Sequence, residues 1–219
     1  MNHQYFLYDK NIFYSQGIRI LITSLLAETT EALYTVTDDY EQLITQLQRR
    51  VNDECCAWIL CDVDSLPRER IHTLQIMKEC YQHENKKMVI LLGKHHMPIF
   101  FALYAIFPTA HWLLKSESME SITLYFKELL QHRCQGYCFS PSLVSYTRRK
   151  LFNRDVEPTI SGNEWWLIEE LFKGKSLSQI SGEINVDVRR LSYIKRHLMK
   201  RLNIRNNIAL FSAFRGMMP

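Results

Sequence analysis

Short apolar runs alternate with segments of helical periodicity along the first 130 residues, and this alternation limits the fold more than any other feature. The runs short enough to be strands are Gln4–Tyr8, Ala32–Val36, Ala57–Cys61, Met88–Leu92 and Ala110–Leu114. Helical spacing follows in Ile12–Leu26, in Tyr40–Arg50, in a segment that begins near Pro67, and in Ser118–Gln131. Strands separated by helices at this spacing predict βαβ units around a parallel sheet. The fourth run is apolar throughout, which is typical of a strand buried on both faces.

This alternation occupies the first part of a chain of 219 residues and leaves room for a second, smaller domain. Five such units predict a doubly wound α/β domain of the flavodoxin or CheY type over residues 1–132. The functional crevice of such a domain lies at the carboxyl ends of its strands. We predict a linker over residues 133–158 and an all-α domain of four helices over residues 159–219.

Positive charge is concentrated in the last quarter of the chain. Residues 159–219 contain 10 Lys/Arg against 5 Asp/Glu, whereas residues 1–158 contain 17 against 18. This asymmetry is expected of a nucleic-acid-binding module attached to another domain. A basic tail without a partner is the alternative, although the charges lie inside a segment with helical periodicity.

The last quarter begins with two helices that carry clear start and stop signals. Ser161 and Glu164 have the spacing of a capping box and precede an apolar-periodic helix. Gly174 is expected to end that helix, and Ser176 is expected to cap the next one.

A tight turn then leads to Asp187, which can cap a third helix running to about Leu202. Asn203 is predicted to be a left-handed stop, and a fourth helix is expected over Asn207–Phe214. Two helices joined by a short turn, with the second one basic at its N-terminal end, have the geometry of a DNA-binding helix-turn-helix.

The third helix carries polar side chains suited to the major groove of DNA. An arginine can donate two hydrogen bonds to one guanine, and Lys and Arg neutralise phosphates. The candidate DNA-binding residues are Arg189, Arg190, Ser192, Tyr193, Lys195 and Arg196. The alternative is that these residues form only the solvated face of a core helix.

Residues 160–214 resemble the LuxR-type (GerE-like) DNA-binding module. The stretch Met199–Leu210, which reads MKRLNIRNNIAL, is similar to the Lys-Leu-Gly-Val-x-Asn-x-x-Ala-Leu ending of that family, and to its RcsB branch in particular. The resemblance implies that Arg189, Arg190 and Tyr193 face the bases or the groove. It implies phosphate contacts for Ser192, Lys195 and Arg196.

Three residues depart from the pattern of that family. Asn203 stands where most members have Gly, Ile194 replaces a polar residue, and Arg190 replaces a Thr. Since the turn, the caps and the last helix are all in place, these departures predict an altered sequence preference with DNA binding retained.

The first 132 residues resemble the receiver domain of bacterial response regulators. That domain transfers a phosphoryl group to an Asp carboxylate next to Mg²⁺. By position, Asp62 matches the phosphate acceptor, Asp9 matches one of two acids, and Lys115 matches the Lys after the fifth strand. Tyr8 stands in the place of the second acid, and Gly93 in the place of the Ser or Thr.

One fewer carboxylate weakens Mg²⁺ binding, and Gly93 offers no hydroxyl to a phosphoryl oxygen. We therefore predict a degenerate receiver whose action does not depend on phosphorylation. Two alternatives stay open. In the first, the chain is a phosphorylatable homodimeric response regulator that uses Asp62. In the second, the polar cluster of Asp9, Asp62 and Lys115 has no function beyond ion pairing among its own members.

The whole layout resembles response regulators of the NarL class, and the altered acidic site resembles auxiliary members such as BglJ and RcsA. The resemblance implies a transcription regulator, and an activator role is expected of it. It implies that the partners are double-stranded promoter DNA and either an RcsB-type response regulator or a second copy of the chain. The density of Phe and Tyr suggests a receiver-side dimer surface over Phe100–Phe107 and Tyr125–Leu130.

The predicted linker contains Gly136 and Tyr137, followed by Ser140 and Pro141, which can cap and open a short helix. A basic stretch follows at residues 147–150 and at Arg154. This stretch either contacts DNA phosphates or forms a solvated face of the linker.

Other classes of protein are disfavoured. The start of the chain lacks the pattern of a signal peptide, and no apolar run is long enough to span a membrane. No Gly-rich phosphate loop, Gly-x-Ser-x-Gly motif or metal-binding cysteine spacing indicates an enzyme, a cofactor or a metal. We expect a cytoplasmic, nucleoid-associated protein whose six cysteines are reduced thiols.

Overall fold

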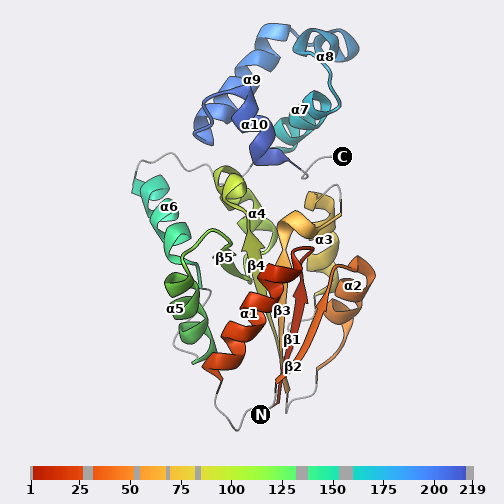
Figure 1. Ribbon diagram of the computed structural model, residues 1–219. Coiled ribbons are helices and arrows are strands. Elements are labelled where there is room, and N and C mark those ends of the chain that lie inside the picture. The colour runs from red at the N-terminus through yellow and green to blue at the C-terminus, as the bar shows by residue number, and fades with distance from the viewer. Residues whose placement is uncertain are drawn as a thin grey trace.

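Five parallel strands form one sheet in the order β2-β1-β3-β4-β5. The structure is a computed structural model, and it describes residues 2–26, 32–51, 55–67, 70–81, 85–131, 138–152 and 160–215. Figure 1 shows the sheet in one part of the molecule and a group of helices in the other. The strands are β1 (Asn2–Tyr8), β2 (Ala32–Thr37), β3 (Cys55–Asp62), β4 (Lys86–Leu92) and β5 (His111–Leu114). All five expected strands are confirmed, with ends that differ by three residues or fewer.

Helices and two short 3-10 turns connect the strands. They are α1 (Ile12–Leu25), α2 (Tyr40–Gln48), η1 (Val63–Ser65), α3 (Arg70–Cys80), η2 (Lys94–Ile99), α4 (Phe100–Ile106) and α5 (Met119–Leu130). Side-chain oxygens of Asn11, Asp39 and Ser118 cap α1, α2 and α5, so local sequence determines where these helices begin. The doubly wound α/β fold is confirmed.

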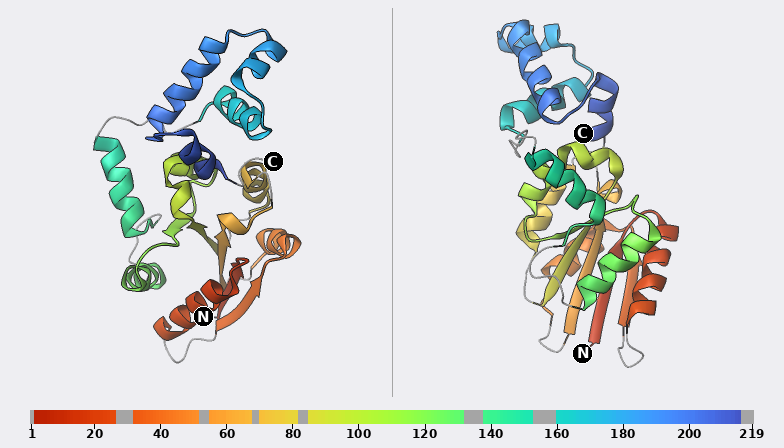
Figure 2. Two further views of the ribbon diagram at one scale, coloured as in Figure 1. Left: turned by 45° about the horizontal axis from the view of Figure 1, so that its top comes forward. Right: turned by 90° about the vertical axis from the view of Figure 1, so that its left-hand side faces the viewer.

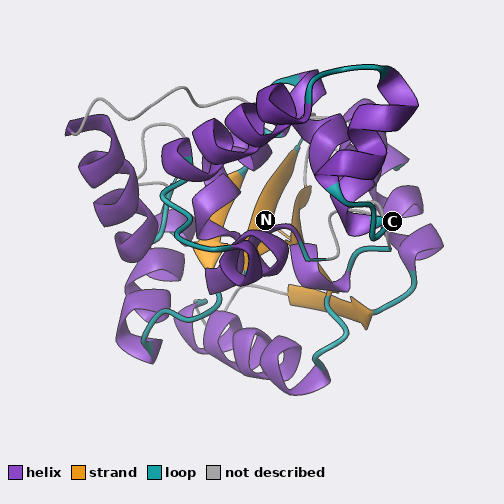
Figure 3. Cartoon of the chain, turned by 90° about the horizontal axis from the view of Figure 1, so that it is seen from above, coloured by secondary structure: helices purple, strands orange, loops and turns teal. Residues whose placement is uncertain are grey.

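The sheet is covered on both faces because neighbouring side chains of a strand point to opposite sides. Tyr5 and Leu7 of β1 join a core cluster with residues of α1 and α5, whereas Phe6 and Tyr8 join a second cluster with residues of α2, α3 and α4. Figures 2 and 3 show the strands between these two sets of helices.

Two expectations about buried residues are wrong. The runs Phe100–Phe107 and Tyr125–Leu130 were expected to form a dimer surface, but most of their large side chains lie in the core. The buried ones are Phe100, Leu103, Phe107, Tyr125, Phe126 and Leu129. Cys138 is disulfide-bonded, so it is not one of six reduced thiols. Cys55, Cys56, Cys61 and Cys80 are free thiols as expected.

Part of the predicted linker folds onto the sheet. Residues 141–152 form α6 (Pro141–Phe152), in which Leu143 is buried. Before it, Phe139 forms a β-bridge with Trp112, and the hydroxyl of Ser140 accepts a hydrogen bond from the amide of Leu114. The predictions for Gly136, Tyr137 and Arg154 lie outside the described residues.

The last part of the chain is helical, with α7 (Gly162–Phe172), α8 (Leu177–Ile184), α9 (Val188–Arg201) and α10 (Asn207–Phe214). The capping box of Ser161 and Glu164 is present, and Asp187 caps α9. Asn203 has a positive φ of 56°, which confirms the predicted left-handed stop. The four expected helices are thus confirmed, and none of the described helices is long and apolar enough to cross a membrane.

The helical part contacts the α/β part through α10. The ring of His96, in η2, is completely buried, and its Nδ1 lies 3.0 Å from the carbonyl oxygen of Ala213 in α10. Ile99 and Phe214 belong to one continuous apolar cluster, so the contact buries apolar surface as well. Figures 1 and 2 show α10 against the end of the α/β part that carries η2 and α4.

We predict that Glu164→Gln loosens the helical part in a pH-dependent way. The Glu164 carboxylate accepts hydrogen bonds from the amide and the hydroxyl of Ser161 and from Arg201, at 2.7–2.9 Å. Burial alone would raise the pKa of Glu164, but these donors outweigh it and lower the pKa below its ordinary 4.5. The stabilisation is therefore present above pH 4.5 and is lost as the pH falls through the lower pKa of the folded state.

Amide hydrogen exchange of α7 in the full chain measures this effect as a free energy of local opening. Glu164→Gln should lower that free energy by about 1–3 kcal/mol at neutral pH, and by much less in acid. The control is Glu169→Gln, because the Glu169 side chain is 39% exposed and pairs with Lys173 on the surface. Equal effects of the two variants would contradict the prediction.

Candidate receiver pocket and nucleic-acid interface

Asp9, Asp62 and Lys115 meet at the carboxyl edge of the sheet, as predicted from the sequence. Asp9 follows β1, Asp62 ends β3, and Lys115 follows β5. The Lys115 Nζ lies 2.8 Å from an oxygen of Asp9 and 3.2 Å from an oxygen of Asp62. Both carboxylates are almost completely buried, so this ion pair is screened little by water.

A fourth residue, Ser65 in η1, completes the cluster. Its hydroxyl lies 2.5 Å from Asp62 Oδ2 and 3.2 Å from Asp9 Oδ1, and it accepts a hydrogen bond from the amide of Lys10. The hydroxyl of Tyr8 donates to the carbonyl oxygen of Ser65. Tyr8 thus fixes the loop in a place where a receiver has its second acid.

The charges of the cluster are unequal, because one ammonium faces two carboxylates. Burial raises the pKa of Asp62, and Asp9 adds to this effect, while Lys115 and the hydroxyl of Ser65 oppose it. Burial would lower the pKa of Lys115, but the two carboxylates raise it above its ordinary value. Lys115 therefore stays charged. One oxygen of Asp62 faces the Lys115 ammonium, and the other contacts the Ser65 hydroxyl.

Gly93 leaves no room for a side chain at the position where a receiver has Ser or Thr. A Cβ atom there would lie 2.5 Å from Asp64 Oδ2 and 2.6 Å from Cε1 of His95. The space of the missing hydroxyl is thus filled by the side chains of Asp64 and His95, which come from η1 and η2.

The second candidate site is the outer face of α9. Arg189, Arg190, Tyr193 and Arg196 are exposed on this helix, and the ring of Tyr193 stacks on His197 with centroids 5.8 Å apart. Ser192 and Lys195 are half-buried. The opposite face is held in the core by Leu191 and Leu198. The structure thus places the predicted residues on an accessible helix face, and their individual roles stay predictions.

The turn before α9 orients this face. Asn185 ends α8 with a positive φ of 52°, and the hydroxyl of Ser181 donates to the carbonyl oxygen of Val186. The carboxylate of Asp187 accepts a hydrogen bond from the amide of Arg189 at 2.7 Å. These contacts fix the N-terminal end of α9, where the basic side chains begin.

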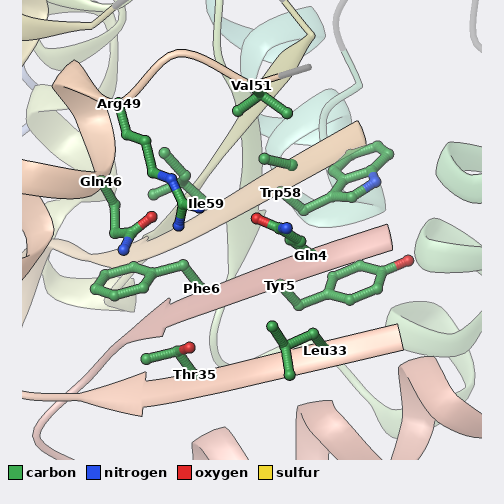
Figure 4. Close-up of a pocket in the computed structure, with 11 residues that line it drawn as sticks. Gln4, Tyr5, Phe6, Leu33, Thr35, Gln46, Arg49, Val51, Trp58 and Ile59 are labelled. Atoms are coloured by element: carbon green, nitrogen blue, oxygen red, sulfur yellow. The ribbon is translucent and has the colours of Figure 1, made fainter. Parts of the chain in front are cut away.

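A small pocket lies elsewhere on the sheet, over β1, β2 and β3 (Figure 4). Gln46 and Arg49, at the end of α2, line it together with Gln4 and Val51. Among the described residues that line it, Tyr5 and Thr35 carry hydroxyls and Arg49 carries the one charge.

Comparison with known proteins gives structural matches alone, since no family model and no curated protein matches the sequence. A structure of two RcsB dimers bound to two parallel DNAs matches with a TM-score of 0.68 and 16% identity, over 99% of each chain. The chain has the fold of RcsB. RcsB from Salmonella enterica serovar Typhimurium, bound to promoter rprA in the presence of phosphomimetic BeF3⁻, matches with a TM-score of 0.66 and 15% identity, over 97% of this chain and 98% of that one.

A third match is RcsB from the same organism bound to promoter P1flhDC, also with the phosphomimetic BeF3⁻. Its TM-score is 0.66 with 18% identity, over 98% of each chain. All three matches span both the α/β and the helical part, so the combination of two folds in one chain is shared with RcsB.

Sequence reasoning missed Ser65, Asp64, His95 and His96. Ser65 carried a weak signal, because a hydroxyl three residues after Asp62 can reach its carboxylate. The adjacent His95 and His96 were visible as a pair, but Asp64 lies 31 and 32 residues away from them. Their meeting depends on the neighbouring positions of β3 and β4 in the sheet.

We predict that Gly93→Ala destabilises the α/β part slightly, although it adds a single methyl group. The new Cβ would push aside the ends of the Asp64 and His95 side chains, which are partly exposed and can turn away, so the expected cost is the loss of their hydrogen bond, about 0.5–1.5 kcal/mol. Gly17→Ala, in the interior of α1, meets nothing within 4 Å and should stabilise the chain by about 0.5–1 kcal/mol. Urea unfolding followed by circular dichroism compares the two variants, and a Gly93→Ala chain as stable as wild type would refute the prediction.

Proposed function

We propose that this chain is a sequence-specific DNA-binding transcription regulator that does not depend on phosphorylation of its receiver-like domain. The observation that carries the proposal is the accessible face of α9. Arg189, Arg190, Tyr193 and Arg196 are exposed in the presence of the described α/β part, and the contact between the two parts uses α10. The α/β part therefore leaves the recognition face uncovered.

The chemistry of that face fits the major groove. Arg189 and Arg190, in the first turn of α9, can each donate two hydrogen bonds to a guanine. Lys195 and Arg196 are placed for phosphates, which fix the register of a recognition helix on the duplex. The matching structures with TM-scores of 0.66–0.68 are complexes of RcsB with DNA, which makes the same ligand the first one to test here.

Independence from phosphorylation is supported by the state of Asp62. Its Oδ2 atom contacts the Ser65 hydroxyl, which would have to be displaced before that oxygen could attack a phosphoryl group. Gly93 supplies no hydroxyl that could bind a phosphoryl oxygen afterwards. A phosphorylatable homodimer that uses Asp62 is the second candidate, favoured by the presence of an acceptor-like Asp next to a Lys.

We further propose that the chain acts as a dimer, with an RcsB-type response regulator as the preferred partner. Two half-sites on DNA require two recognition helices, so a single module binds weakly. The apolar side chains of Ile12, Phe13 and Ile20 are exposed along α1. We take this helix as the dimer surface, in place of the two buried runs that the sequence suggested. Phe13 is 91% exposed, and such a residue gains most from a partner that covers it.

We propose no enzymatic activity, because the acidic, basic and hydroxyl groups of the receiver pocket contact one another. We place the protein in the cytoplasm, where promoter DNA is found. We also propose that the chain activates transcription, and this part rests on the resemblance to the auxiliary regulators alone.

We predict that base-facing and phosphate-facing residues of α9 can be separated by measurement. Arg190→Ala should cost about 1–3 kcal/mol on a specific operator and relax the preference at one base position. Lys195→Ala should weaken binding to all duplexes and reduce the salt slope by about one. Fluorescence anisotropy measures both, with an operator selected from random duplexes by the wild-type chain.

Lys127→Ala is the matched control, because Lys127 is an exposed cation on α5, outside the proposed interface. Binding that is insensitive to salt, or equal losses for Lys127→Ala and Arg190→Ala, would rule out α9 as the recognition helix.

A mobility shift on an RcsB-type promoter fragment tests the partner. We expect a shift with this chain and an RcsB-type regulator together that exceeds the shift of either alone, with no change when acetyl phosphate is added to this chain first. Phe13→Glu should abolish the joint shift, whereas Leu33→Glu, also an exposed apolar residue, should preserve it.

The second candidate makes the opposite forecast. A tight shift by this chain alone, strengthened by acetyl phosphate and lost in Asp62→Asn, would establish the phosphorylatable homodimer instead.

A further inference from the structure

Asp64, His95 and His96 form a cluster beside the receiver pocket. The Nε2 atoms of His95 and His96 lie 3.0 Å and 3.1 Å from Oδ1 of Asp64. One ligand atom from each of the three residues lies within 4.8 Å of the other two. His96 is completely buried, whereas the side chains of His95 and Asp64 are 37% and 34% exposed.

The hydrogen-bond partners of His96 restrict its protons. The carbonyl oxygen of Ala213 can only accept, so the Nδ1 of His96 carries the proton of that 3.0 Å contact. In a neutral ring the Nε2 then presents a lone pair, and this lone pair points at the carboxylate of Asp64. Two acceptors at this distance repel each other unless a second proton on the ring or a metal ion lies between them.

A divalent transition metal meets this requirement. Zinc binds imidazole nitrogen and carboxylate oxygen at about 2.0–2.2 Å in a tetrahedron, which places neighbouring ligand atoms about 3.3 Å apart. The two nitrogen–oxygen distances of 3.0 Å and 3.1 Å are close to that spacing. Imidazole ligands select zinc-type ions over Mg²⁺, which prefers oxygen.

Two further features fit a built site. Histidines that bind a metal almost always donate their other ring N–H to a carboxylate or a backbone carbonyl, as His96 does to Ala213. Gly93 provides the space in which Asp64 and His95 approach each other, since any side chain there would collide with both. The partial exposure of Asp64 and His95 leaves a side on which water can supply a fourth ligand.

We propose that Asp64, His95 and His96 bind a divalent metal ion of the zinc type, and that this ion strengthens the contact between η2 and α10. Coordination at Nε2 fixes the proton of His96 on Nδ1, and that proton makes the hydrogen bond to Ala213. Because binding free energies are reciprocal, the ion favours the docked helix and the docked helix favours the ion. The proposal is independent of whether the chain binds DNA.

Titration of the metal-stripped full chain with Co²⁺, with the disulfide of Cys138 kept intact, tests the site. We expect one equivalent to give the visible absorption of four-coordinate cobalt with nitrogen and oxygen ligands, without the charge-transfer band of cobalt bound to thiolate. Zn²⁺ should displace it. His95→Gln and Asp64→Asn should weaken binding at least about tenfold, because each removes a ligand. His72→Gln, an exposed histidine of α3, should bind as wild type does.

Hydrogen exchange of the α10 amides measures the second part of the proposal. Zn²⁺ should slow exchange in residues 207–214 of the wild type and of His72→Gln, and should leave His95→Gln unchanged. His95 is partly exposed, so its variant is expected to fold, which circular dichroism checks.

Co²⁺ that does not bind, or that binds equally to His95→Gln, would overturn the metal site and leave a metal-free ion pair between Asp64 and a doubly protonated His96. Binding without protection of α10 would overturn the link between the domains.

Discussion

The ammonium of Lys115 holds the carboxyl edge of the sheet together. Asp9 and Asp62 are 2% and 1% exposed, and an uncompensated buried carboxylate costs several kcal/mol. The single positive charge of Lys115 faces both carboxylates, and Ser65 donates a hydrogen bond to the pair. The loops after β1, β3 and β5 therefore converge on one point. These contacts link the ends of three strands, whatever the reactivity of Asp62.

The arrangement of η1 extends this constraint to the other domain. Ser65 ties η1 to the buried cluster, and Asp64, one residue earlier, contacts both histidines of η2. His96 then reaches α10 through Ala213. Each of these contacts is direct, and each joins groups that are mostly buried or that contact two partners. A contiguous set of contacts is a route by which the two domains can influence each other, and the size of that influence is a matter of measurement.

The sequence predicted the elements better than the contacts between them. Continuous apolar runs located every strand, and residues with strong local preferences located helix ends, such as Ser161, Asp187 and Asn203. The burial of the Phe-rich run at residues 100–107 could not be predicted, because composition does not reveal which side of a short helix faces the sheet. The Asp64–His95–His96 cluster could not be predicted from spacing, since strand order, and not sequence distance, brings its members together.

The way the two parts meet limits how the receiver-like domain can control DNA binding. A domain that covered α9 would regulate by blocking it, but the contact uses α10, and the arginines of α9 stay exposed. If the chain binds DNA as a dimer, as proposed, control acts on where α9 points relative to a second subunit. Dimers bind half-sites at a fixed spacing, so a small rotation of one helical domain changes the fit at the second half-site. A firm α10 contact favours one orientation over others, and this makes the η2–α10 junction, more than the buried Asp62, the place where regulation is expected to act.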